Sequence, residues 1–172
     1  MRQGGILIRR FRMFFALALS LTVLFVGCAG EPRSAEDMLL EICVSLSMPA
    51  GRVYFRAAEE GSENFLPVDT TEAMYGEEAE EIFALVEDFA IYVSEIASPR
   101  EVAVFRCYSS SDTDSVAAIC LERVDMIRVL LKDGGASELA QGAQVTVRGH
   151  YVVMIVTGDA EAAEDAIRSA FK

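Results

Sequence analysis

The sequence predicts an α+β domain in which an antiparallel sheet of about four strands is covered on one face by helices. Four runs rich in β-branched and aromatic residues occur in two neighbouring pairs, 83–94 with 101–108 and 145–148 with 151–157. Short links within each pair favour antiparallel pairing. Amphipathic helical segments precede, separate and follow the pairs, which is the order of a helix-covered sheet. A chain of 172 residues fits one domain.

The first predicted helix begins after Ser34. Ser34 and Asp37 have the spacing of a capping box, and apolar residues then recur at helical intervals until Pro49 and Gly51. The pattern over 52–67 is weak and is compatible with a short strand plus a loop or with a surface meander.

Thr70 or Thr71 is predicted to cap a brief helical turn that ends at Gly76. The strand pair 83–94 and 101–108 follows an acidic cluster and is interrupted by Ser98 and Pro99.

A long helix is predicted after Ser111 or Asp112, ending near Gly134 and Gly135. One stripe of this helix carries Val116, Ile119, Cys120, Arg123, Val124, Ile127, Leu130 and Leu131. In the second strand pair, Gly149 and His150 suit a two-residue turn, and the continuously apolar run 151–157 is expected to be central. Asp159 is predicted to cap the last helix, which turns Ala163, Ile167, Ala170 and Phe171 toward the sheet.

The first 27 residues have the organisation of an export signal. The segment has four arginines up to Arg12, then an apolar run over 13–26, then the small residues Gly27 and Ala29 around Cys28. A helix that spans the membrane needs roughly 20 apolar residues, so this run is shorter than a permanent membrane anchor requires. The segment can be an ordinary signal peptide or an uncleaved short anchor. A third interpretation, cleavage before Cys28 and lipidation of that residue, comes from the residues around Cys28.

The residues 24–28, Leu-Phe-Val-Gly-Cys, resemble a lipobox, the cleavage signal of bacterial lipoproteins. The resemblance implies a signal peptide over 1–27, a diacylglyceryl lipid on Cys28 as the only attached group, a tether over 28–33 and one α+β domain over 34–172. The expected location is the outer, extracytoplasmic face of the cell membrane. At about 3.5 Å per residue the tether reaches about 20 Å.

The charge is strongly negative after the leader. Four of the 15 basic residues and none of the 27 acidic residues precede Cys28, so the remainder has a net charge of about −16. Such a surface repels phosphate backbones, which argues against nucleic acid as a partner. The expected partners are the membrane, through the lipid, and another envelope protein or a small ligand.

Three short segments resemble a family of small lipoproteins of anaerobic Gram-positive bacteria that is defined by a domain of unknown function. They are Met74-Tyr75-Gly76, Leu121-Glu122-Arg123 and residues 149–153, Gly-His-Tyr-Val-Val. The resemblance covers 34–171 and implies a fold and a location. It implies no activity and no functional residues.

Cys43, Cys107 and Cys120 remain after lipidation of Cys28. Cys43 and Cys120 lie on apolar helix stripes, which favours buried free thiols. A disulfide between Cys107 and either Cys120 or Cys43 stays open, since thiols outside the membrane can be oxidised. No two cysteines have the spacing of metal ligands.

No catalytic, cofactor-binding or metal-binding residue is predicted. His150 is the one histidine and suits a turn, and the acids 77, 78, 80, 81, 112 and 114 lack the spacing of a calcium loop. The leading hypothesis is a non-enzymatic binding or interaction domain. The alternatives are an envelope enzyme with an unrecognised site and an accessory subunit of an envelope or sporulation complex.

Overall fold

A computed structural model describes residues 32–95, 100–130, 139 and 142–172. The signal peptide, Cys28, the Ser98-Pro99 link and the predicted helix end at Gly134 and Gly135 lie outside these residues. The segment from Arg33 to Lys172 forms one compact unit. The α+β class and the antiparallel sheet are confirmed.

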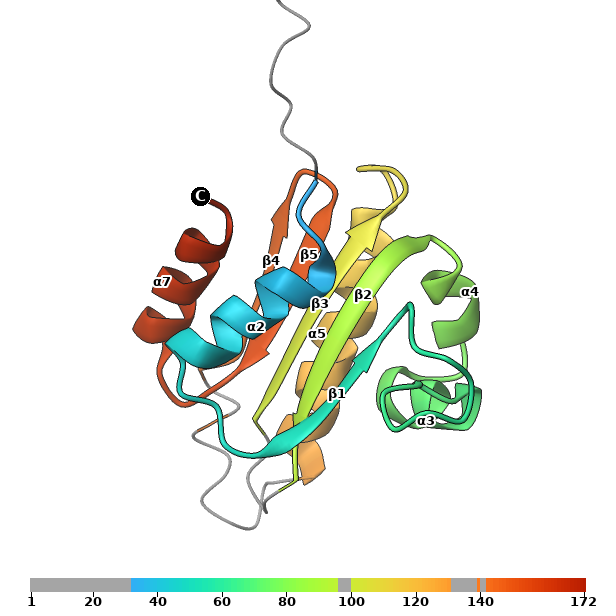
Figure 1. Ribbon diagram of the computed structural model, residues 1–172, viewed down its shortest axis with the longest axis horizontal. Helices are drawn as coiled ribbons and strands as arrows, with labels where there is room; N and C mark the ends of the chain where they lie inside the picture. The colour runs from blue at the N-terminus through green and yellow to red at the C-terminus, as the bar shows by residue number, and fades with distance from the viewer. Residues whose placement is uncertain (1–31, 96–99, 131–138, 140–141) are drawn as a thin grey trace, which may run out of the picture. The chain divides into compact units, whose positions relative to one another are not determined.

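The sheet has five antiparallel strands in the order β1-β2-β3-β5-β4, one more than predicted (Figure 1). The additional strand is β1, in the segment with the weak pattern. The strands are β1 (Gly51–Phe55), β2 (Val86–Ser94), β3 (Glu101–Cys107), β4 (Gln144–Arg148) and β5 (Tyr151–Val156). Both predicted strand pairs are confirmed, and Gly149 adopts φ 60° in the turn between β4 and β5.

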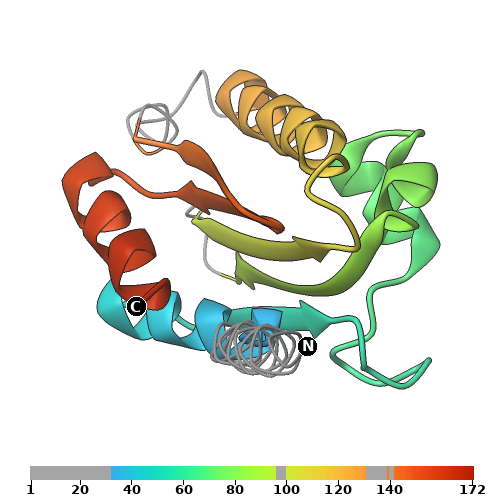
Figure 2. The same cartoon turned by 90° about the horizontal axis from the view of Figure 1, so that it is seen from above.

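Helices cover both faces of the sheet, so the prediction of one covered face is wrong (Figure 2). One face carries α3 (Val68–Tyr75), α4 (Ala79–Phe83) and α5 (Thr113–Leu130), and the other carries α2 (Ala35–Ser45) and α7 (Ala160–Ala170). Both faces are covered because the strands have apolar side chains on both sides of the sheet. Along β3, Ala103, Phe105 and Cys107 belong to one core, and Val102 and Val104 belong to the other.

The predicted helix ends are partly confirmed. Ser34 accepts a hydrogen bond from the backbone N–H of Asp37, and Asp159 accepts one from Ala162. The prediction that Thr70 or Thr71 caps a helix is wrong, because α3 begins at Val68, directly after Pro67. The Thr71 hydroxyl instead donates to the Pro67 carbonyl inside that helix (3.0 Å). Gly76 ends α3 with φ 92°, as predicted.

The outer edge of β1 is covered by the loop that follows it. The Asn64 amide donates to the Val53 carbonyl (2.7 Å), and the Phe55 N–H donates to the Asn64 carbonyl (3.1 Å). These bonds satisfy backbone groups that an edge strand would otherwise expose. They also fix Phe65 and Leu66 beside the end of β1.

Candidate functional site

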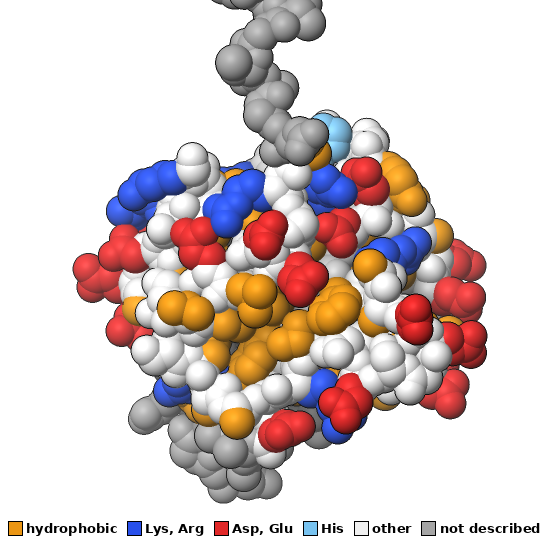
Figure 3. Space-filling model, in the orientation of Figure 1, with side chains coloured by type: hydrophobic (Ala, Val, Ile, Leu, Met, Phe, Trp, Pro, Cys, Tyr) orange, Lys and Arg blue, Asp and Glu red, His pale blue; other side chains and the backbone are white. Residues whose placement is uncertain are grey.

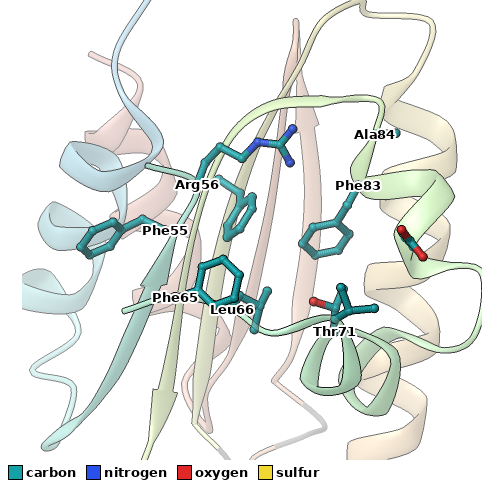
Figure 4. Close-up of a pocket in the computed structure, with 10 residues that line it drawn as sticks. Phe55, Arg56, Phe65, Leu66, Thr71, Phe83 and Ala84 are labelled. Carbon is teal, nitrogen blue, oxygen red and sulfur yellow. The ribbon is translucent and has the colours of Figure 1, made fainter. Parts of the chain in front are cut away.

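The best candidate site is an open pocket between the end of β1, the start of β2 and the helices α3 and α4 (Figure 4). Its volume is about 390 Å³, within the range of small-molecule sites. It is lined by Phe55, Arg56, Phe65, Leu66, Val68, Thr71, Glu80, Phe83, Ala84 and Phe89. Apolar side chains dominate this lining.

The inner wall of the pocket is a rigid aromatic cluster. The rings of Phe83 and Phe89 are 7% and 6% exposed and meet edge to face, with centroids 5.3 Å apart. Phe105 and Tyr75 continue the cluster into the core through further ring contacts. Because each such ring pair adds about 0.5–1.5 kcal/mol beyond its buried area, the wall is held in place before any ligand arrives.

The outer wall comes from the loop after β1. Phe65 and Leu66 face Phe83 across the pocket, and the side chain of Phe55 points the other way, toward α2 (Figure 4). The Arg56 guanidinium lies at one edge of the pocket, on the side away from Phe65 and Leu66 (Figure 4). This arrangement can enclose an apolar group and leaves one basic group at the opening.

Behind the pocket, a buried ion pair connects α5 to β3. Arg123 donates from Nη2 to Glu101 Oε2 (2.7 Å) and from Nε to the same oxygen (3.1 Å). The side chains of Glu101 and Arg123 are 2% and 14% exposed. The Tyr75 hydroxyl donates to Glu101 Oε1 (3.3 Å) and so links α3 to the same carboxylate.

The surroundings of this ion pair shift the ionisation of Arg123 and Tyr75. Burial alone lowers the pKa of Arg123, but the charge and hydrogen bonds of Glu101 outweigh burial, so the pKa of Arg123 lies above its usual value. Burial, followed by the charge of Glu101, raises the pKa of Tyr75 well above its usual value. None of the three residues lines the pocket, so the cluster supports helix placement rather than ligand contact.

A second, more polar pocket lies near the start of β1 and is lined by Gly51, Arg52, Val53, Glu63, Asn64 and Glu95. Its Asn64 amide is engaged in the hydrogen bond to Val53. It offers no aromatic wall. The first pocket is therefore the better candidate for a binding site.

The residues weighed for catalysis or metal binding do not converge. His150 is exposed in the turn between β4 and β5, Glu80 and Glu81 lie in α4, and Asp114 lies in α5. Within the described ranges, no three His, Cys, Asp or Glu side chains lie close enough together to hold a metal ion. No helix in the part of the chain that the structure describes is both long and apolar enough to cross a membrane.

Cys43, Cys107 and Cys120 are free thiols in the structure. Cys107 on β3 and Cys120 on α5 are buried in the same core, and Cys43 is half-buried beside the other core. Burial raises the pKa of Cys43 to about 12, and burial with the charge of Asp112 raises the pKa of Cys107 to about 11. Burial also raises the pKa of Cys120.

These thiols are expected to resist alkylation at pH 8 in the folded protein, because the reactive thiolate is scarce and two of the sulfurs are buried. Denaturation is expected to expose all three to a thiol reagent. The thiols also make stability depend on pH: unfolded cysteines lose protons from about pH 9, whereas the folded ones stay protonated, so the free energy of unfolding falls above that pH. Fewer than three reactive thiols after denaturation would instead reveal a disulfide.

The sequence did not single out the pocket residues or the buried ion pair. Phe65 and Leu66 form a short apolar pair between polar residues and Pro67, which was the only local sign of a wall. Glu101 directly precedes the apolar run 102–105, and Arg123 interrupts an apolar helix stripe. A charge at each of two core positions was a usable signal for a buried pair.

Two of the three segments that carry the family resemblance meet at Glu101, and the third lies elsewhere. Tyr75 and Arg123 both contact Glu101, whereas residues 149–153 form the turn before β5 and the first part of that strand. None of these residues lines the pocket, so the three segments bear on the fold and not on the binding site. No protein-family model, curated protein or solved structure matches the chain.

Proposed function

We propose that this protein is an extracytoplasmic lipoprotein, attached to the cell membrane through lipid on Cys28, whose single domain binds an apolar group in the pocket between β1, β2, α3 and α4. The observation that carries the binding part is the aromatic pocket of about 390 Å³. The observation that supports the attachment is the lipobox-like segment over residues 24–28. The resemblance to small lipoproteins of unknown function agrees with this location.

The start of the domain suits a short tether. The Arg33 guanidinium donates to the Ala170 carbonyl (2.6 Å) and to Glu41 (2.8 Å), and the Tyr151 hydroxyl donates to the Arg33 carbonyl (2.8 Å). Because residue 33 is held by α2, α7 and β5, only a few residues separate Cys28 from a fixed point. A tether of this length keeps the start of the domain within about 20 Å of the headgroups.

A binding function fits the pocket better than an enzymatic one. The lining offers hydrophobic area and two charged residues, Arg56 and Glu80, both exposed. Enzyme sites need a nucleophile or a general acid or base within hydrogen-bond reach of a reacting atom. Thr71 is the one hydroxyl among the described lining residues, and it donates to Pro67.

A pocket-filling substitution tests the binding function. Ala84 is exposed and lines the pocket, so Ala84→Trp is expected to fill it and to weaken binding of an apolar dye at least 10-fold, the loss that about 1.4 kcal/mol of contact energy produces. Ala73→Trp is the matched control, because Ala73 is exposed on α3 and is not a lining residue. Each variant adds one Trp to a chain that has none, so the dye is excited directly, at a wavelength where indole does not absorb.

Docking of another envelope protein is the second candidate, and one observation favours it. Leu40 and Val44 on α2 are 47% and 78% exposed. On this face, hydrophobic side chains gather in a band over α2 and β1 with acidic side chains around it (Figure 3). If Ala84→Trp and Ala73→Trp bind the dye equally well, this band becomes the better candidate for the interaction surface.

A further inference from the structure

Arg56 is an unusual feature of the pocket. It is the only basic residue among the described lining residues, in a segment whose acidic residues far outnumber its basic ones. Its backbone N–H donates to the Phe89 carbonyl (3.1 Å), which fixes the residue at the end of β1. Its guanidinium forms no hydrogen bond or ion pair with any residue that the structure describes.

The guanidinium lies where a ligand inside the pocket would end. In Figure 4 its side chain runs from the end of β1 along one edge of the pocket, and the guanidinium lies on the side of Phe83 away from Phe65 and Leu66. A guanidinium has five N–H donors and matches a carboxylate or a related anion with two parallel hydrogen bonds. An apolar body between the walls therefore places an anionic end group at Arg56.

We propose that the pocket takes a small amphiphile with an apolar body and a single anionic end, which Arg56 binds. This inference rests on the proposed binding function and names its ligand class. The anionic end is a carboxylate or a sulfate-like or phosphate-like group, since all of them offer oxygens to the guanidinium. The apolar body contacts Phe65, Leu66, Phe83 and Phe89.

Glu80 determines the orientation of this ligand. Glu80 also lines the pocket and is exposed, on α4 rather than on β1. Its negative charge repels an anion, so the anionic end turns toward Arg56 and away from α4. Removing that charge in Glu80→Gln is expected to strengthen binding of an anionic amphiphile relative to binding of a neutral one.

The test compares head groups on one apolar chain. Decanoate, decyl sulfate, decanol and decyltrimethylammonium are titrated below their micelle concentrations into the Arg33–Lys172 unit, which contains both hydrophobic cores. Binding is measured by calorimetry. The two anions are expected to bind about 5-fold more tightly than decanol, the gain of one partly exposed ion pair of about 1 kcal/mol. Decyltrimethylammonium is expected to bind most weakly.

Arg56→Gln is expected to remove the advantage of about 5-fold that both anions have over decanol. Arg52→Gln is the matched control, because Arg52 is also an exposed arginine, on β1 itself, but lines the other pocket. It is expected to change none of the four affinities. Thermal unfolding of each variant verifies that it is folded.

The outcomes separate this inference from the proposed function. If decanol binds and Ala84→Trp abolishes that binding, but the anions have no advantage that depends on Arg56, the anionic ligand class is wrong and the binding function stands. If none of the four amphiphiles binds, both are wrong. A preference of decanoate over decyl sulfate, or the reverse, lost in Arg56→Gln, supports the inference and identifies the end group.

Discussion

Replacing Arg123 with Met is expected to lower the free energy of unfolding by about 3–5 kcal/mol, because it leaves the Glu101 carboxylate buried without its cationic partner. Glu101 is 2% exposed, so water cannot replace the lost hydrogen bonds without opening the core. Of the side chains that donate to Glu101 among the described residues, the Tyr75 hydroxyl would remain. Urea denaturation of the Arg33–Lys172 unit measures the change.

Arg128→Met is the matched control for this substitution. Arg128 lies on the same helix and pairs with Asp125 at 2.7 Å, the same distance as the Arg123–Glu101 pair, but both side chains of that pair are well exposed. Its loss is expected to cost less than about 1 kcal/mol. The double variant Glu101→Leu with Arg123→Met is expected to recover most of the stability. Equal effects of the two arginine substitutions would show that the buried pair has no special role.

Replacing Cys28 with Ala is expected to remove the protein from the membrane almost completely. A diacylglyceryl group contributes about 0.8 kcal/mol per buried methylene, and two acyl chains make attachment stable where one chain is marginal. Fractionation of cells that express the full-length chain measures the change, with Cys43→Ala as the control that keeps the lipidation site.

Mass spectrometry of the membrane-bound protein tests the same prediction at the level of the covalent structure. The expected mass corresponds to residues 28–172 with lipid on Cys28. A protein that retains Met1, or that has an unmodified residue 28, would rule out the lipoprotein account. A Cys28→Ala variant found in the membrane in the normal amount would do the same.

The strands were predictable where the local pattern was strong. Val152 to Val156 are all fully buried, and they form most of the apolar run 151–157 from which the sequence predicts a central strand. The structure places β5 between β3 and β4, while β3 is the middle strand of the sheet. Local patterns contain no information on this order, because it is set by long-range pairing such as that of Glu101 with Val156.

The number of covered faces was predicted incorrectly for a related reason. Strands with both faces buried have continuous apolar runs, and both β3 and β5 have this property. The short antiparallel links favoured a sheet with one face open to water. The apolar runs were the more informative signal, because each buried face needs a helical layer to cover it.

The pocket was not predictable, because its residues come from separate elements that meet only in the folded chain. Arg56 and Phe65 lie in a stretch without periodicity, and the local pattern predicts a strand at Phe83 although this residue ends α4. The Asn64 hydrogen bonds that position one wall depend on the backbone of β1, an edge strand. Their partners are separated by about ten residues of irregular loop, a geometry that side-chain patterns do not encode.

The central claim is that an apolar group binds between the two aromatic walls, and NMR of decanol bound to the Arg33–Lys172 unit tests it most directly. Nuclear Overhauser contacts are expected between the alkyl chain and the rings of Phe83, Phe89 and Phe65, which line the pocket. Contacts confined to Leu40 and Val44, the exposed apolar residues of α2, or no contacts with the protein at saturating decanol, would contradict the account.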